Sequence, residues 1–211
     1  MGRYESIWSD LTIAAHRAYT RWLQAGSGGN LSARLPDGRG MIVKSSGGSF
    51  GDCGTCGEGW TAISFDGRPL SSGAAKPTRE WRLHAALLEA LPDVGAVVHC
   101  HSPWAVAWSA GHAEIPAATW QSGLKLGGAV PVLDCKAAVV PPEELGRVRG
   151  LFLDIPGLSA FILRGHGLVA VGKTAVEAEH TAELVEETAK VCVLQALLRA
   201  AEQKKEEDYA L

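Results

Sequence analysis

Two histidines at a spacing of two, His99 and His101, are the residues of this sequence best suited to carry chemistry. They lie in the apolar segment at 95–101, Gly-Ala-Val-Val-His-Cys-His, whose pattern predicts a buried strand. Alternate residues of a strand point to the same face, so both imidazoles project together and can share one metal ion. Two polar rings buried there without a partner would be costly. The pair therefore indicates a metal site, whereas a single histidine in such a strand would more often be a hydrogen-bonded core residue.

A third ligand is needed, and His166 is the best candidate among the remaining histidines. It lies in the segment Arg-Gly-His-Gly at 164–167, between two apolar runs, and its flanking glycines allow a sharp turn. Three histidine ligands with an open fourth position are typical of a catalytic zinc site, although three imidazoles also accept Mn²⁺ or Co²⁺. We assign no ligand role to the other four histidines, at positions 16, 84, 112 and 180.

Glu80 is the candidate general acid or base. It is predicted to lie in the first turn of a helix over 78–91, directly before the strand that carries the histidine pair. A carboxylate there also gains from the helix dipole, so a purely structural role is the alternative. His84 follows four residues later and is expected to contact Glu80 on the same helix face.

Two glycine-rich turns are candidate anion sites. They are Gly-Ser-Gly-Gly-Asn at 26–30 and Ser-Gly-Gly at 46–48. Turns of this kind expose backbone N–H groups that can surround an anion, although most are only turns. Because the net charge of the chain is −3, affinity for an anion must come from local donors, namely Lys44, Thr78 and Arg79, and from the metal.

The cysteines predict neither a zinc knuckle nor a redox pair. Cys53 and Cys56 form a single C-x-x-C in a glycine-rich loop, with no second pair of ligands at short spacing. Cys100, Cys135 and Cys192 lie in apolar surroundings and are expected to be small core residues.

The elements that must position these residues alternate irregularly between helices and strands. Helices are predicted at 6–25, at 78–91 and from Thr174, where Thr174 and Glu177 form a capping box. Strands are predicted at 31–35, 41–44, 61–65, 95–101, 130–133, 159–163 and 168–171. Consecutive strands without regular βαβ units favour a single α+β domain, 1–211, with a mostly antiparallel sheet and a charged tail at 202–211.

Composition excludes several classes of protein. The 211 residues are 46% hydrophobic, which suffices for one substantial core. No run of 18 apolar residues suggests a membrane span, and the first residues lack the apolar segment of a signal peptide, so a cytoplasmic location is expected. No basic run suggests a nucleic-acid partner.

Five motifs, in order, resemble those of the class II aldolase/adducin family, over about residues 6–200. They are GSGGNLSAR, VKSSGG, KPTRE, AVVHCHSPWAVAWS and RGHGLVAVG. The resemblance implies a three-layer α/β/α domain with a central, mostly antiparallel sheet. It also implies a homotetramer with active sites near subunit interfaces, to which a tail residue such as Tyr209 of a neighbour can contribute.

The resemblance assigns roles to the candidate residues. It implies His99, His101 and His166 as zinc ligands and Glu80 as the proton-transfer residue. It also places four residues around a substrate phosphate, namely Asn30, Ser46, Gly47 and Thr78. Arg79 replaces the second serine of the usual pair, and its guanidinium can hold a carboxylate or phosphate.

The implied function is a metal-dependent carbon–carbon lyase that acts on a small sugar phosphate or sugar acid through an enediolate. Thr78-Arg79-Glu80, after a Leu-Ser-x-Gly turn, looks like the 3-oxo-tetronate 4-phosphate decarboxylases, so decarboxylation of such a substrate is the first expectation. Cleavage of a ketose phosphate by an aldolase of the fuculose-phosphate type is the second, followed by a dehydratase or a 4-epimerase. Glu80 counts against the epimerase, which tends to carry Asp there. A non-enzymatic, adducin-like binding module is disfavoured by the intact histidines.

Overall fold

The computed structural model describes residues 4–135 and 137–209, with side chains through residue 205. Within these residues, eight strands form one sheet in the order β3-β2-β1-β4-β8-β7-β6-β5. All neighbouring strands are antiparallel except β6 and β7, which are parallel. The strands are β1 Asn30–Arg34, β2 Gly40–Lys44, β3 Trp60–Ser64, β4 Ala96–Cys100, β5 Glu114–Ile115, β6 Val130–Leu133, β7 Ala160–Leu163 and β8 Gly167–Gly172.

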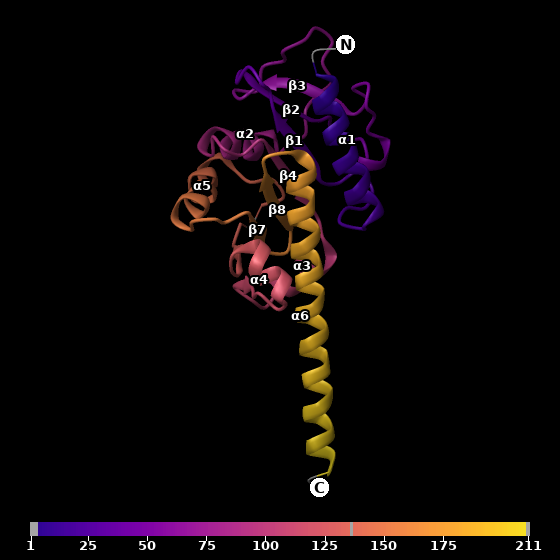
Figure 1. Cartoon of the computed structure of the whole chain (residues 1–211), viewed down its shortest axis with the longest axis vertical. Coiled ribbons are helices and arrows are strands. Elements are labelled where there is room, and N and C mark those ends of the chain that lie inside the picture. Colours follow the sequence, from indigo (N-terminus) through magenta and orange to yellow (C-terminus); the bar gives the residue numbers. More distant parts are fainter. Residues whose placement is uncertain (1–3, 136, 210–211) are drawn as a thin grey trace.

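Helices cover both faces of this sheet (Figure 1). The α-helices are α1 Glu5–Thr20, α2 Trp81–Ala90, α3 Pro103–Ser109, α4 Trp120–Leu126, α5 Leu145–Asp154 and α6 Ala175–Tyr209, and the short 3-10 helices are η1 Phe50–Asp52 and η2 Pro142–Glu144. One apolar core lies between the sheet and helices α1, α3 and α6, and a second lies between the sheet and helices α2 and α5. The expected α+β, three-layer arrangement with a mostly antiparallel sheet is therefore confirmed.

Strand β4 shows how the alternation of side chains places the site. Ala96, Val98 and Cys100 belong to the core beneath α1 and α6, whereas Val97 belongs to the core beneath α2 and α5. His99 shares the face of Val97, because alternate residues point the same way. Asn30 of β1 is paired directly with His99, so it lies at the same end of the sheet.

Helix α1 ends five residues earlier than the predicted 6–25, and the reason is a helix-terminating turn without glycine. Trp22 takes a positive φ of 62°. The N–H of Leu23 then donates to the carbonyl of Ala18 at 2.9 Å, and the N–H of Trp22 donates to Tyr19 at 3.2 Å. This hydrogen-bond pattern is the Schellman motif, which usually has glycine at the left-handed position. Because tryptophan is rare at this position, the sequence does not indicate that the helix ends here.

The last helix begins as predicted, but its capping differs. The N–H of Glu177 donates to the Thr174 hydroxyl at 3.1 Å, as in a capping box, whereas the Glu177 carboxylate accepts from the N–H of Lys173 at 2.9 Å. Asp10 of α1 supplies the remaining cap, because its carboxylate accepts from the N–H of Ala175 at 2.6 Å. The charged segment after residue 201, expected to be a tail, continues as helix α6 through Tyr209.

Candidate active site

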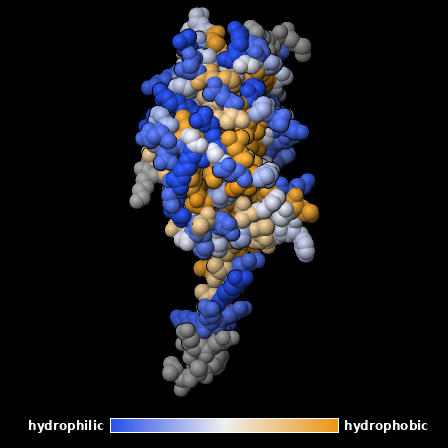
Figure 2. All heavy atoms as spheres, turned by 90° about the vertical axis from the view of Figure 1, so that its left-hand side faces the viewer, coloured by the Kyte–Doolittle hydropathy of each residue, from blue (hydrophilic) through white to orange (hydrophobic). Residues whose placement is uncertain are grey.

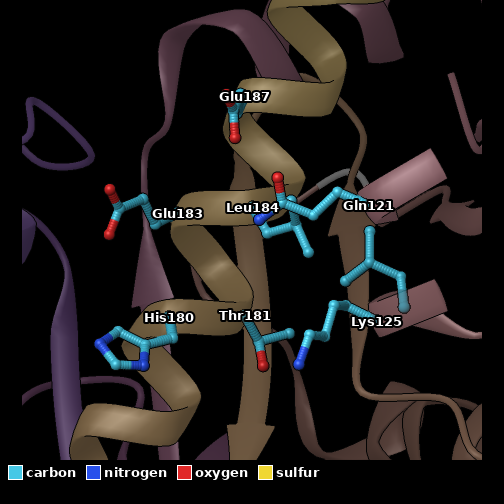
Figure 3. Close-up of a pocket in the computed structure, with 8 residues that line it drawn as sticks. Gln121, Lys125, His180, Thr181, Glu183, Leu184 and Glu187 are labelled. Atoms are coloured by element: carbon cyan, nitrogen blue, oxygen red, sulfur yellow. The ribbon is translucent and has the colours of Figure 1, made fainter. Parts of the chain in front are cut away.

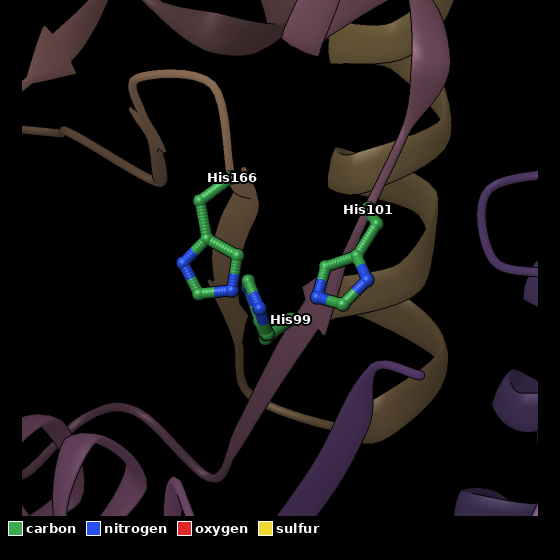
Figure 4. Close-up of side chains that lie close together, drawn as sticks. All are labelled: His99, His101 and His166. Carbon is green, nitrogen blue, oxygen red and sulfur yellow. The ribbon is translucent and has the colours of Figure 1, made fainter. Parts of the chain in front are cut away.

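Three histidines from separate parts of the sequence meet at one end of the sheet (Figure 4). His99 lies in β4, His101 follows the last residue of that strand, and His166 lies in the turn between β7 and β8. One nitrogen from each ring falls within 4.8 Å of the others. The ring centroids are 4.8 to 5.1 Å apart. The structure therefore brings together all three residues that the sequence proposed as ligands.

The donor set of this cluster fits a cation. Nδ1 of His99 lies 3.0 Å from the carbonyl oxygen of Leu168 and must carry the proton of that hydrogen bond, which leaves a lone pair on Nε2. His99 Nε2 and His166 Nδ1 are buried and find no hydrogen-bond partner in the described part of the chain. Burial holds the pKa of His99 well below its usual range, so the ring is neutral near pH 7. A metal ion between the rings would satisfy His99 Nε2, whereas His166 Nδ1 points away from the other two rings, and His166 Nε2 is the nitrogen that faces the cluster (Figure 4). A backbone carbonyl behind a ligating histidine is the usual support for a metal ligand.

Close backbone packing fixes the positions of the rings. A Cβ at Gly167 would lie 2.9 Å from the His99 ring and 3.1 Å from the His101 ring, and a Cβ at Gly28 would lie 2.9 Å from His101 Nδ1. Any side chain at Gly28 or Gly167 would therefore push a ring away. Gln24 is a supporting residue that sequence reading missed. Its side-chain oxygen accepts from the N–H of His101 at 2.8 Å, and no spacing signal in the sequence marks it.

Glu80 lies beside the three histidines. The prediction that it lies in the first turn of the helix is wrong. It is the residue immediately before α2, and its side chain does not cap that helix. Its carboxylate turns inward instead, with Oε2 at 3.4 Å from His99 Nε2 and Oε1 at 3.9 Å from His166 Nε2. Oε1 is buried and has no hydrogen-bond partner among the described residues. The carboxylate thus faces the candidate metal site rather than the helix N-terminus.

The expected direct contact between His84 and Glu80 is replaced by an indirect one. His84 hydrogen-bonds to Ser32 and to the side-chain oxygen of Asn30. Asn30 Nδ2 in turn donates to Glu80 Oε2 at 2.8 Å. The reason is geometric, because Asn30 and Ser32 project from the face of β1 that α2 covers.

A cavity of about 280 Å³ opens beside Glu80, His101 and His166. Its lining includes all five residues expected to bind substrate or phosphate, namely Asn30, Ser46, Gly47, Thr78 and Arg79. The N–H groups of Ser46 and Thr78 are already used, since they donate to the carbonyls of Lys76 and Lys44. The hydroxyl groups of Ser46 and Thr78, the side chain of Arg79 and the remaining amide proton of Asn30 are therefore donors that these residues offer to a ligand.

Lys44 also lines the cavity, and its ammonium group is almost fully buried, with 2% of the residue exposed. Burial lowers the pKa of Lys44 from 10.5. Its Nζ lies 3.5 Å from the carbonyl of Ser27 and 3.4 Å from that of Ser45. Lys44 and Arg79 make this end of the cavity positive, which suits an anionic substrate despite the negative net charge of the chain.

Other candidate features lie away from this site. A hollow of about 400 Å³ between α4 and α6, which includes His180, shares no lining residue with it (Figure 3). Cys53 is buried and Cys56 exposed, both as free thiols, and burial raises the pKa of Cys53 to about 11, which disfavours the reactive thiolate. Cys100, Cys135 and Cys192 are buried as expected. The side chain of Tyr209 lies outside the described residues.

Two properties of the site define the chemistry it can support. Three imidazoles with a free position can hold a Lewis-acidic metal, which would stabilise negative charge on a substrate oxygen. A buried carboxylate beside them can move a proton. Together they suit reactions that leave an enediolate next to a carbonyl group.

Sequence comparison identifies relatives that are named as an aldolase and a decarboxylase. The chain is 32% identical over 179 residues to 5-methylthioribulose-1-phosphate/5-deoxyribulose-1-phosphate aldolase of Rhodospirillum rubrum, covering 85% of this chain and 76% of that protein. It is also 32% identical over 197 residues to 3-oxo-tetronate 4-phosphate decarboxylase of Escherichia coli K12, covering 89% of this chain and 86% of that protein.

Comparison with solved structures finds the same kind of fold. The crystal structure of YgbL from Escherichia coli superposes with a TM-score of 0.78 at 28% identity, covering 90% of this chain and 89% of that one. None of the described helices is long and apolar enough to cross a membrane. Residues 9–193 match the class II aldolase and adducin N-terminal domain, and the chain therefore belongs to that family.

Proposed function

We propose that this protein is a zinc-dependent carbon–carbon lyase that decarboxylates a substrate resembling 3-oxo-tetronate 4-phosphate. The observation that carries the proposal is the position of Glu80 Oε1, which is buried, without a hydrogen-bond partner among the described residues, and 3.9 Å from His166 Nε2. A carboxylate oxygen left unsatisfied beside three histidines and an open cavity is suited to proton transfer rather than to structural support.

In the proposed reaction, separate groups of residues bind the metal, bind the substrate and transfer the proton. His99, His101 and His166 would hold the Zn²⁺, which would stabilise the negative charge that develops on the substrate. Lys44, Thr78 and Arg79 bind the phosphate and carboxylate groups and orient the substrate in the cavity. The bond to the carboxylate carbon breaks, carbon dioxide leaves, and its bonding electrons form the enediolate. Glu80 Oε1 takes up a proton from solvent in the open cavity and passes it to the carbon that lost the carboxylate, so that Glu80 returns to its ionised form.

Aldol cleavage of a ketose phosphate is the second candidate, because the Rhodospirillum rubrum aldolase matches the chain as well as the decarboxylase does. The electronic demand is the same, but an aldehyde leaves instead of carbon dioxide. Arg79 favours the decarboxylase, since it offers a second cationic group to a substrate that carries both a carboxylate and a phosphate. A sugar-phosphate dehydratase or 4-epimerase would use the same residues.

A panel of substrates tests the proposal. The purified full chain, loaded with Zn²⁺, is incubated with phosphorylated 3-oxo acids and with ketose phosphates, and released carbon dioxide and aldehyde are measured separately. We expect carbon dioxide from the oxo acids. Aldehyde alone would favour the aldolase, and no turnover of any member would contradict the proposal.

Two variants test the assigned roles. His99→Ala should abolish both bound zinc, measured by elemental analysis, and turnover, whereas the exposed His180→Ala should change neither. Glu80→Gln should keep the metal but lower kcat by roughly 10²–10⁴-fold, the range for a lost general acid or base. Glu89→Gln on the same helix is its control. Full activity of His99→Ala without metal would rule out the mechanism.

The proposal includes a homotetrameric assembly. Several large apolar side chains are exposed in the single chain, with Trp120 at 92% and Leu124 at 82% on α4. Such exposure on one helix is typical of an interface between subunits.

A further inference from the structure

A chain of buried hydrogen bonds connects β1, α2 and the candidate catalytic carboxylate. Ser32 Oγ lies 2.7 Å from His84 Nδ1, His84 Nε2 hydrogen-bonds to Asn30 Oδ1, and Asn30 Nδ2 donates to Glu80 Oε2 at 2.8 Å. Ser32 and His84 are fully buried, and Asn30 and Glu80 are 3% and 7% exposed. Water therefore cannot substitute for a missing partner in the middle of this chain.

Donor and acceptor counting allows one arrangement of these groups when Glu80 is ionised. A carboxylate only accepts, so Asn30 must present its NH₂ group to Glu80 and its oxygen to His84. The oxygen of Asn30 also only accepts, so the proton of the neutral His84 ring must be on Nε2. Nδ1 of His84 then accepts the hydroxyl proton of Ser32. Each group fixes the orientation of the next.

The far end of the chain shows that it does not conduct protons. Ser32 is fully buried and its backbone is paired with Val43 of β2 and Val97 of β4. A proton passed to this hydroxyl would have no route to solvent. The chain can therefore serve to orient Glu80 but not to exchange its proton.

We propose that His84 is a positioning residue, which acts through Asn30 to hold Glu80 Oε2 as a hydrogen-bond acceptor and leaves Oε1 as the oxygen that faces the reaction. The catalytic consequence rests on the proposed function of Glu80. Without the Nε2 proton of His84, the Asn30 amide can rotate and place its oxygen against the carboxylate, which repels it. Glu80 would then leave its position beside His99 and His166.

The second N–H of Asn30 has a consequence for substrate binding. Asn30 lines the cavity, and one of its two amide protons is used by Glu80. The orientation imposed by His84 leaves the other proton as a donor for a ligand. The same histidine thus fixes both the carboxylate and one polar group of the cavity wall.

The tautomer of His84 is the first test, and it needs no activity. Nitrogen-15 NMR of the full chain loaded with Zn²⁺, with labelled histidine and His84 assigned by comparison with His84→Gln, reports which ring nitrogen carries the proton. We expect a neutral ring with the proton on Nε2. A proton on Nδ1, or a protonated ring at pH 7, would overturn the proposal. This measurement holds even if no tested sugar phosphate is turned over, an outcome that would contradict only the proposed function.

Two substitutions at His84 provide the second test. His84→Leu removes the donor, and His84→Gln restores an N–H near the position of Nε2. With the substrate that the panel identifies, we expect His84→Leu to lower kcat by about 10–100-fold with KM changed less than threefold, as for other supporting residues of metal sites. We expect His84→Gln to recover most of the loss. Bound zinc should stay the same in both variants.

A matched control separates positioning from general damage to the sheet. Thr61 is also buried, its hydroxyl has no partner in the described part of the chain, and it lies in β3 outside the hydrogen-bond chain. Thr61→Val should leave kcat unchanged. Equal losses in His84→Leu and His84→Gln, at unchanged melting temperature and zinc content, would overturn the proposal. If His84→Leu does not fold, the NMR measurement of the His84 tautomer and the kcat of His84→Gln still test the positioning role of His84.

Discussion

Burial sets the protonation state of the histidines near the site. The pKa of His99 is lowered first by burial and then by the neighbouring His166 and His101, and the pKa of His101 is lowered by burial and by His166. Neutral rings keep their lone pairs available at pH 7, which a metal ligand requires. The same burial lowers the free energy of unfolding at acid pH, because the unfolded chain binds protons that the buried rings of the folded chain do not.

We expect His84 to make the protein less stable as the pH falls below about 6.5. Burial lowers the pKa of His84 from 6.5 to about 3 in the folded chain. Between these values the unfolded chain binds a proton that the folded chain does not, so the free energy of unfolding falls by about 1.4 kcal/mol per pH unit from this group. Above pH 6.5 both states are neutral and the contribution is constant.

Urea unfolding of the wild type and of His84→Gln, measured from pH 7 to pH 4, checks this expectation. Glutamine does not titrate, so its advantage over histidine should grow as the pH falls. A stability difference that stays constant across this range would contradict the assignment of His84 as a buried neutral ring.

At the scale of elements, the turn between β7 and β8 is held in place by Arg164. Its guanidinium donates to Asp134 and to the carbonyl of Ser109 at the end of α3. It also donates to the carbonyl of His112 at 3.0 Å. The adjacent Gly165 has a φ of +65° and donates its N–H to the hydroxyl of Ser109 at 3.1 Å. These contacts tie the turn that carries the third histidine to β6 and α3.

We expect Arg164→Met to weaken metal binding without removing a ligand. Loss of the guanidinium frees the turn, so His166 spends less time in the position that completes the cluster. The dissociation constant for Zn²⁺, measured by competition with a chelating dye, should rise by about 10–100-fold. Arg147→Met is the control, because Arg147 donates to the carbonyl of Asp134 at 3.0 Å and to Glu144, whereas Arg164 donates to the Asp134 carboxylate from within the turn. Equal affinities in the two variants would contradict this role.

The elements differ in how well the sequence predicted them. Seven of the eight strands agree with the prediction to within one residue, because their apolar runs are bounded by glycine, proline or charge, whereas the two-residue strand β5 is not predicted. Helices α3, α4 and α5 were not predicted. Helix α4 shows the reason, since Trp120 and Leu124 are exposed at 92% and 82%, and Leu126 alone of its apolar side chains is buried in the core. Apolar periodicity cannot reveal a short helix whose apolar side chains face outward.

At the scale of the whole molecule, the exposed apolar side chains need an explanation. The C-terminal part of α6 projects alone from the body (Figure 1), and Leu197 and Leu198 on it are 61% and 65% exposed. Apolar side chains also gather in the middle of the face seen in Figure 2. Isolated exposed leucines are common, but groups of them are typical of interfaces.

We expect the double variant Trp120→Ala, Leu124→Ala to shift the proposed tetramer toward smaller species. Both side chains are exposed in the single chain, so removing them should change the stability of the monomer little. Sedimentation velocity measures the distribution of species. Ile13→Ala, which removes an exposed apolar side chain from α1, is the control. A wild-type chain that sediments as a monomer would contradict the proposed assembly.

The sequence by itself determined seven of the eight strands, the fold class and the three candidate ligands, because these depend on local patterns. Residue spacing places His99 and His101 on one face, and flanking glycines mark the turn of His166. Only the tertiary structure decided where Glu80 points, that Asn30 lies between it and His84, and that Gln24 supports His101. The contacts of Asn30 with Glu80 and His84, and of Gln24 with His101, join residues 50 or more positions apart. Their geometry depends on strand pairing and on which face of the sheet α2 covers. Local sequence patterns do not contain that information.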